Sequence, residues 1–155
     1  TGHTLKKLHA QGFTNLYGLD NSPHMIEFAP KGIASYFLSD TFLGDGYDMI
    51  LCNWTLHFIK DKENYLRAMA DGLKDGGTMI LSEKTSKDTD LIKMYHDNKL
   101  KLGVTEEQIK MKQKQLENVM FINSADWYQE KLETLGFKVT VMDADWCFTT
   151  FLCKK

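Results

Sequence analysis

Short runs rich in apolar residues alternate with amphipathic stretches through the first half of the chain. Apolar runs bounded by polar turns predict β-strands, whereas apolar residues at helical spacing predict α-helices. The expected strands are Thr14–Leu19, Ala34–Leu38, Tyr47–Cys52 and Thr78–Leu81. The expected helices are residues 5–10 ending at Gly12, a helix starting at Asn21-Ser22-Pro23, and Lys62–Leu73 stopped by Gly76-Gly77. This alternation is typical of a mostly parallel α/β sheet.

The pattern changes after Glu83. Residues 88–120 are polar, Lys-rich and helical in character, and Gly103 predicts a break between two helices. A further helix is expected over Ser124–Leu135, with Ser124 as its N-cap and Gly136 after its end. Because a short link between strands implies an antiparallel hairpin, we expect one at the C-terminus. Its parts are the strands Val139–Met142 and Cys147–Cys153 and the polar turn Asp143-Ala144-Asp145.

Composition narrows the class of protein. The chain has 155 residues, of which 43% are apolar, so it can bury a sizeable core as one domain. Its formal net charge of −2 gives no electrostatic argument for an obligatory nucleic-acid partner, and direct RNA binding is left open. No apolar run is long enough for a transmembrane helix. Three scattered cysteines make a metal site or a disulfide framework poor interpretations. We therefore expect a cytoplasmic domain without a metal ion or a membrane anchor.

Polar clusters follow the two earlier strands. Asp20 stands at the end of a strand, 18 residues after Gly2. A Gly-rich turn followed about 20 residues later by a carboxylate is typical of ribose binding, although Asp20 could also cap the helix at Ser22. Asp40 follows the next strand and could accept a hydrogen bond from an exocyclic amine such as that of adenine. The alternative for Asp40 is a solvated turn residue.

Two more clusters follow the next strands. Asn53, Trp54, Thr55 and His57 come after the strand ending at Cys52, and Ser82-Glu83 follow the strand Thr78–Leu81. His57 is a candidate general base because its unperturbed pKa is near neutrality, and the alternative is a satisfied structural histidine. Because the ends of parallel strands meet at one edge of a sheet, the four clusters together predict a ligand site there.

The chain resembles S-adenosylmethionine-dependent methyltransferases with a Rossmann-like fold. Three segments carry the resemblance: Thr1-Gly2, Gly18-Leu19-Asp20-Asn21-Ser22-Pro23-His24-Met25 and Leu73-Lys74-Asp75-Gly76-Gly77-Thr78-Met79-Ile80. It implies a single methyltransferase-like domain over residues 1–155, with a helical insertion at about residues 88–122. It also implies a cofactor site formed by Gly2, Asp20, Asn21, Asp40, Thr41 and Asn53.

A narrower resemblance is to carboxy-S-adenosylmethionine synthases, which act in tRNA wobble-uridine modification and use prephenate. It is carried by Asn53-Trp54-Thr55-Leu56-His57-Phe58-Ile59, Leu81-Ser82-Glu83-Lys84, Tyr95-His96-Asp97 and Leu116-Glu117-Asn118-Val119-Met120. On this basis we expect a small-molecule substrate, and a homodimer formed through the insertion. The expected substrate-facing residues are Trp54, Thr55, Ser82, Glu83, Tyr95 and Gln113, and the candidate bases are His57 and His96.

Gln113 departs from the narrower family, which has an arginine at this position. A guanidinium can hold a carboxylate through two parallel hydrogen bonds, whereas an amide cannot. Lys112 and Lys114 flank Gln113 and are alternative counter-charges. We therefore expect ordinary methyl transfer with S-adenosylmethionine, and carboxy-S-adenosylmethionine synthesis is the alternative.

The family's first strand and most of its Gly-rich loop have no counterpart in this sequence. We therefore expect an N-terminally truncated fold that lacks the first strand, with unpaired strand edges on either side of it. A rival interpretation is a cofactor-binding remnant without catalysis. A nicotinamide-dependent oxidoreductase is disfavoured, because Asp40 and the Leu-Lys-Asp-Gly-Gly loop have no necessary role there.

Overall fold

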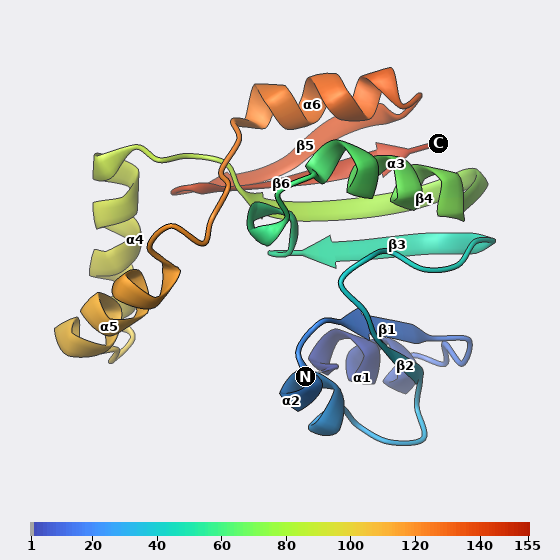
Figure 1. Ribbon diagram of the computed structural model, residues 1–155, viewed down its shortest axis with the longest axis horizontal. Helices are drawn as coiled ribbons and strands as arrows, with labels where there is room; N and C mark the ends of the chain where they lie inside the picture. The colour runs from blue at the N-terminus through green and yellow to red at the C-terminus, as the bar shows by residue number, and fades with distance from the viewer. Residues whose placement is uncertain (1) are drawn as a thin grey trace. The chain divides into compact units, whose positions relative to one another are not determined.

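A computed structural model describes residues 2–155, and these fall into two compact units, 2–44 and 45–155 (Figure 1). Each unit is described by itself. Unit 1 contains the helices α1 (His3–Ala10) and α2 (Pro23–Glu27) and the strands β1 (Tyr17–Asp20) and β2 (Ser35–Leu38). The two strands pair in parallel and form a two-stranded sheet. The predicted strand, helix, strand order of this segment is therefore confirmed.

Unit 2 is built on a four-stranded sheet in the order β3-β4-β6-β5. Its strands are β3 (Tyr47–Asn53), β4 (Leu73–Lys84), β5 (Lys138–Asp145) and β6 (Phe148–Lys154). β3 and β4 are parallel, whereas β6 pairs antiparallel with both β4 and β5. The predicted antiparallel hairpin at the C-terminus is therefore confirmed. The helical elements are η1 (Leu56–Phe58), α3 (Lys62–Gly72), α4 (Thr89–Lys101), α5 (Glu106–Leu116) and α6 (Ala125–Thr134).

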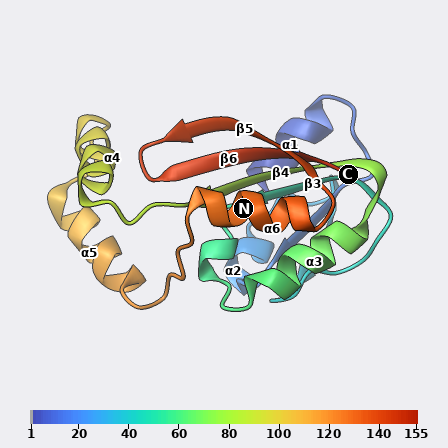
Figure 2. The same cartoon turned by 90° about the horizontal axis from the view of Figure 1, so that it is seen from above.

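Helices α3 and α6 lie side by side on one face of the unit 2 sheet (Figure 2). They bury the core of the unit between themselves and the strands. Ser124 caps α6 by accepting from the Trp127 N–H, and Gly136 follows its end with a positive φ, as the sequence predicts. The most deeply buried apolar residues of this core are Leu56, Leu66, Met69, Met79, Leu81, Tyr128, Leu132 and Phe151.

Helices α4 and α5 form an arm beyond the carboxyl ends of β3 and β4 (Figure 1). The predicted break near Gly103 is confirmed, because α4 ends at Lys101 and Thr105 caps α5 through a capping box with Gln108. None of the residues of α4 is buried, and Ile109 alone is buried in α5. No helix among residues 2–155 is both long enough and apolar enough to span a bilayer.

The hairpin turn lies further along the chain than the sequence suggests. Asp143 and Asp145 belong to β5, and the turn consists of Trp146 and Cys147. Polar residues are tolerated in β5 because it is an edge strand with an exposed face. A register shift between Val141 and Asp143 carries the pairing on to Asp145. The polar Asp-Ala-Asp string was therefore wrong as a turn prediction.

Candidate functional site

The ends of β1 and β2 bring two polar pairs together in unit 1. The strand pairing ends at Asp20, whose carbonyl oxygen accepts from the Ser39 N–H at 3.1 Å. Asp20 and Asn21 therefore lie beside the turn that carries Asp40 and Thr41. The Ser39 Oγ accepts from the Thr41 N–H at 3.1 Å and fixes this turn. The residues expected at the ribose and the adenine are thus neighbours, and their binding role stays a prediction.

The carboxylate of Asp20 keeps acceptor capacity for a ligand. Its Oδ1 accepts from the Ser22 N–H at 2.9 Å, at the start of α2. Within residues 2–155, no hydrogen-bond donor is placed on Oδ2. Because an ionised carboxylate offers about four acceptor sites, Asp20 can cap α2 and still receive ribose hydroxyls. Asp40 is exposed, so its carboxylate can also accept from an amine. These residues fit the adenosine portion of the implied cofactor.

Gly2 has a packing reason to be glycine. Its φ of 67° lies in the left-handed region, and a Cβ atom there would come within 2.8 Å of Pro30 Cδ and 3.0 Å of Tyr36 Oη. The Tyr36 hydroxyl is buried without a hydrogen-bond partner among the described residues, and burial raises its pKa. Close packing therefore accounts for Gly2, and its cofactor role stays a prediction. Thr1, the other half of this motif, lies outside the described residues.

The ends of β3 and β4 meet in unit 2. Asn53 pairs with Ser82 in the parallel register, and the Trp54 N–H donates to the Ser82 carbonyl oxygen at 2.7 Å. The Ser82 hydroxyl lies 2.9 Å from the Thr150 hydroxyl of β6. Thr55 donates its own hydroxyl to the Asn53 carbonyl oxygen at 3.2 Å. The predicted neighbours at this sheet edge are therefore side by side.

Glu83 is the most heavily bonded side chain at this edge. Its Oε1 accepts from the N–H groups of Thr55 and Leu56, each at 2.8 Å. Its Oε2 accepts from the His57 N–H at 3.0 Å and lies 2.6 Å from His57 Nδ1. The residue is fully buried, because alternation along β4 turns it to the same face as Met79 and Leu81. A buried carboxylate of this kind needs such donors, so Glu83 fixes the loop after β3.

His57 lies within this loop and is nearly buried, with 5% of its surface exposed. Because Nδ1 faces the Glu83 carboxylate, Nδ1 carries the ring proton of the neutral form and Nε2 is the acceptor. The His57 carbonyl oxygen also accepts from the Phe121 N–H at 2.7 Å, which ties the segment after α5 to the same loop. The geometry gives His57 a positioning role, and its role as a base stays a prediction.

Four aromatic rings gather at the end of the unit 2 sheet: Trp54 after β3, Tyr95 on α4, Trp146 in the β5–β6 turn and Phe148 on β6. The Phe148 ring centroid lies 5.2 Å from that of Tyr95 and 5.8 Å from that of Trp54, and the Tyr95–Trp146 separation is 5.7 Å. Trp54 is 62% exposed. Trp54 and Trp146 both have positive φ angles, of 55° and 50°. Such strained backbone is frequent at functional sites. We call these four residues the aromatic cluster.

Basic groups border the aromatic cluster. The Lys99 ammonium lies 4.2 Å from the Tyr95 ring centroid, and the His96 ring lies 5.8 Å from Tyr95. Burial, and then the ammonium groups of Lys99 and Lys84, lower the pKa of His96, against a smaller opposing effect of Asp97. At neutral pH His96 is therefore largely uncharged and able to accept a proton.

Gln113 lies on the exposed surface of α5. Lys112 and Lys114 are exposed as well, and no hydrogen bond or ion pair among residues 2–155 joins either ammonium to Gln113. The substrate role of Gln113 therefore stays a prediction.

Sequence reasoning missed two members of the aromatic cluster, Trp146 and Phe148. The sequence pattern places Trp146 beside the expected turn Asp143-Ala144-Asp145 and Phe148 inside the expected strand Cys147–Cys153, and neither position predicts contact with a ligand. Both reach the cluster only through the pairing of β6 with β4, which sets Phe148 opposite Lys84. A correct prediction of the β5–β6 register would have placed Trp146 and Phe148 at this end of the sheet.

The sequence of this chain is similar to those of known methyltransferases. A family model described as a methyltransferase domain matches residues 1–141. The carboxy-S-adenosyl-L-methionine synthase of Erwinia tasmaniensis is 32% identical over 141 residues, an alignment that covers 79% of this chain and 57% of that protein. The chain thus spans about half the length of the curated relatives it matches.

Two solved structures share the fold at low sequence identity. A Haloferax volcanii methyltransferase in complex with the Trm112 methyltransferase activator superposes with a TM-score of 0.72 at 16% identity, covering 99% of this chain and 77% of that chain. An S-adenosylmethionine-dependent methyltransferase from Mesorhizobium loti gives a TM-score of 0.71 at 17% identity, covering 99% and 86%. The predicted Rossmann-like methyltransferase fold is therefore confirmed.

Proposed function

The chain belongs to the S-adenosylmethionine-dependent methyltransferase family, and from this premise we propose that it transfers a methyl group to a planar acceptor. The acceptor is a small molecule or an RNA-linked base. The observation that carries the proposal is the aromatic cluster, whose Trp54 ring stays exposed at the ends of β3 and β4. Aromatic faces bind planar groups of many kinds by stacking, at about 1–3 kcal/mol per ring.

The cofactor supplies a methyl carbon that is already electrophilic on its sulfonium. The work left to the protein is mainly to bind and orient, since in-line placement alone can supply a large part of the barrier reduction. Asp20 and Asn21 would hold the ribose, and Asp40 and Thr41 would lie at the adenine. Glu83 would hold the loop Thr55–His57, which directly follows Trp54 of the aromatic cluster.

His96 is the better placed of the two candidate bases. Its lowered pKa keeps the ring neutral at pH 7, and its neighbour Tyr95 belongs to the aromatic cluster. A base is needed only when the acceptor atom carries a proton. His57, whose Nδ1 is committed to Glu83, would act through orientation of the loop.

A second candidate is carboxy-S-adenosylmethionine synthesis. The relative from Erwinia tasmaniensis carries that name, and the Leu116–Met120 string is of the same type. Against it stands Gln113, because an amide leaves a bound carboxylate without a counter-charge. We therefore favour S-adenosylmethionine as the donor in this chain.

Replacing Trp54 with Ala tests the acceptor site. We expect transfer of label from methyl-labelled S-adenosylmethionine, assayed with bulk tRNA and with a small-molecule extract, to fall at least tenfold, because one stacking surface is lost. Cofactor affinity should remain unchanged. Phe13→Ala, at a 56% exposed ring in unit 1, is the matched control. Equal transfer by the Trp54→Ala variant would contradict the proposal.

We also propose a homodimer in the cytoplasm. The arm α4–α5 exposes the apolar side chains of Met94, Leu102 and Met111, by 54%, 75% and 55%. A second copy of the arm across a two-fold axis would cover them, because two-fold symmetry is the commonest symmetry of soluble oligomers.

All three cysteines are free, which suits the reducing environment of the cytoplasm. Light scattering should give twice the monomer mass, and Leu102→Glu should give the monomer mass. A monomer without the substitution would contradict the dimer.

A further inference from the structure

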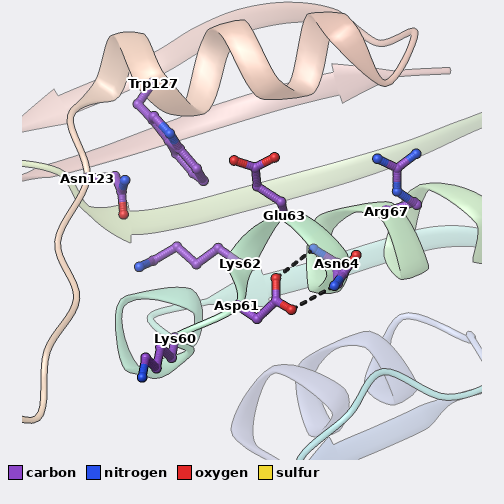
Figure 3. A pocket seen from close by; sticks show the side chains of 8 residues that line it. All are labelled: Lys60, Asp61, Lys62, Glu63, Asn64, Arg67, Asn123 and Trp127. Carbon is purple, nitrogen blue, oxygen red and sulfur yellow. Dashed lines mark hydrogen bonds between the residues drawn. The ribbon is translucent and has the colours of Figure 1, made fainter.

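A polar pocket of about 360 Å³ opens in unit 2 between the N-terminal ends of α3 and α6 (Figure 3), and no residue of the aromatic cluster lines it. The volume is that of a small-ligand site, far more than one ion requires. Its lining residues are Lys60, Asp61, Lys62, Glu63, Asn64, Arg67, Asn123 and Trp127. None of them belongs to the cofactor or acceptor residues proposed above.

The acidic side chains of the pocket are already engaged. Asp61 caps α3 by accepting from the Asn64 N–H at 3.3 Å and from its side-chain Nδ2 at 2.6 Å. Glu63 forms an ion pair with Lys131 at 3.1 Å. Glu63 is therefore paired with a lysine that does not line the pocket, and among residues 2–155 neither carboxylate forms an ion pair with Lys62.

The basic side chains of the pocket are not engaged in this way. Lys62 is 95% buried, with 5% of its surface exposed, and extends along the pocket towards Asn123 (Figure 3). Within residues 2–155 its ammonium has no hydrogen-bond or ion-pair partner, and it lies 5.7 Å from the centroid of the Phe121 ring. Glu83 acts on it only at longer range and is committed to four other donors. Lys60 and Arg67 are exposed, and neither has an ion-pair partner within residues 2–155.

Burying an ammonium group without a partner raises the free energy of the folded protein, and an anionic ligand that pairs with the ammonium would offset this desolvation penalty. Burial lowers the pKa of Lys62, against an opposing effect of the Glu83 carboxylate, and Lys87 adds a smaller lowering. The Trp127 indole forms a flat wall beside it (Figure 3), and the Asn123 amide supplies a further donor. A positive group, a donor and an aromatic face in one cavity are the parts that recognise a phosphate attached to a planar ring.

We propose that this pocket binds a nucleoside monophosphate, with the phosphate at Lys62 and the base against Trp127. The pocket shares no residue with the proposed cofactor site, and the proposal does not rest on the proposed methyl transfer. The carboxylate of Glu63, which is paired with Lys131, would repel the phosphate and so keep it at the Lys62 end of the pocket.

The test is calorimetric titration of the full-length protein with uridine monophosphate, with S-adenosylmethionine present in excess so that the cofactor site is filled. We expect binding that weakens at least tenfold in Lys62→Met, a substitution of similar length without charge. Trp127→Leu should lower the affinity for the nucleotide several-fold and leave the affinity for inorganic phosphate unchanged. Lys138→Met, at an exposed lysine on β5, is the matched control and should bind as the unsubstituted protein does.

Three outcomes would overturn the proposal: no binding of the nucleotide, binding that Lys62→Met leaves unchanged, or equal affinity for inorganic phosphate and the nucleotide. Because Lys62→Met replaces a buried unpaired charge by an apolar group, it should unfold at the same temperature or higher. A melting curve therefore separates loss of binding from loss of folding. The chemical shift of the Trp127 indole N–H, which should move with the nucleotide and not with phosphate, locates the base.

Discussion

Replacing Glu83 with Gln is expected to lower the free energy of unfolding by about 2–4 kcal/mol, the range for losing charge-assisted hydrogen bonds in a buried site. The amide keeps the size of the side chain but loses the charge, and its NH₂ group would face N–H donors. Four donors converge on this carboxylate: the backbone N–H groups of Thr55, Leu56 and His57, and the Nδ1–H of the His57 ring. Urea unfolding followed by circular dichroism measures the change.

The matched control is Glu130→Gln on the exposed face of α6, which should change stability by less than about 0.5 kcal/mol. Because Glu83 holds the loop beside the aromatic cluster, the Glu83→Gln variant should also lose transfer activity at temperatures where it is still folded. Equal stability of the two variants would show that the carboxylate does not organise the loop.

Replacing Asp20 with Ala should weaken S-adenosylmethionine binding by more than tenfold. The expected loss is a charge-assisted hydrogen bond to the ribose, worth about 1.5–3 kcal/mol. Asp20→Asn should lose less affinity for S-adenosylmethionine, because its amide oxygen can still accept from the Ser22 N–H and so preserve the N-terminal end of α2. Isothermal titration calorimetry measures both variants.

Asp71→Ala, at an exposed carboxylate near the end of α3, serves as the control for Asp20 and should bind as before. If Asp20→Ala binds S-adenosylmethionine with undiminished affinity, Asp20 caps α2 and does nothing more. That outcome would return the residue to the structural alternative that the sequence left open.

Local patterns were enough to predict most elements. Gly103 and the capping residue Ser124 mark helix boundaries by backbone chemistry that depends on a few neighbouring residues. The parallel register of β3 and β4 likewise brings Asn53 and Ser82 together as strand ends should. Such features need no knowledge of distant contacts.

Other features depend on distant pairing. The sequence predicted a helix ended by Gly76-Gly77 and a strand starting at Thr78. The helix instead ends at Gly72, and β4 begins at Leu73 because its pairing with β3 begins at Tyr47 and Leu73. The turn at Trp146 depends in the same way on the shifted β5–β6 register. Glycine and aspartate favour turns locally, and strand pairing overrides that preference.

The burial of Glu83 could have been predicted from the sequence. Met79, Leu81 and Glu83 alternate along β4 and share its buried face. A carboxylate in phase with core residues predicts a buried, fully bonded group. Its expected role facing substrate stays a prediction, alongside its observed bonding to the loop. Lys62 carried no sequence signal of this kind, because an isolated lysine at a helix start is ordinarily solvated.

The most direct test of the account is a titration of the full-length protein with S-adenosylmethionine and with its carboxylated form, repeated on Gln113→Arg. We predict that the unsubstituted protein binds S-adenosylmethionine more tightly. We also predict that Gln113→Arg gains about an order of magnitude in affinity for the carboxylated form, the scale of one charge-assisted pair. Tighter binding of the carboxylated cofactor by the unsubstituted protein, or no binding of either, would contradict the account.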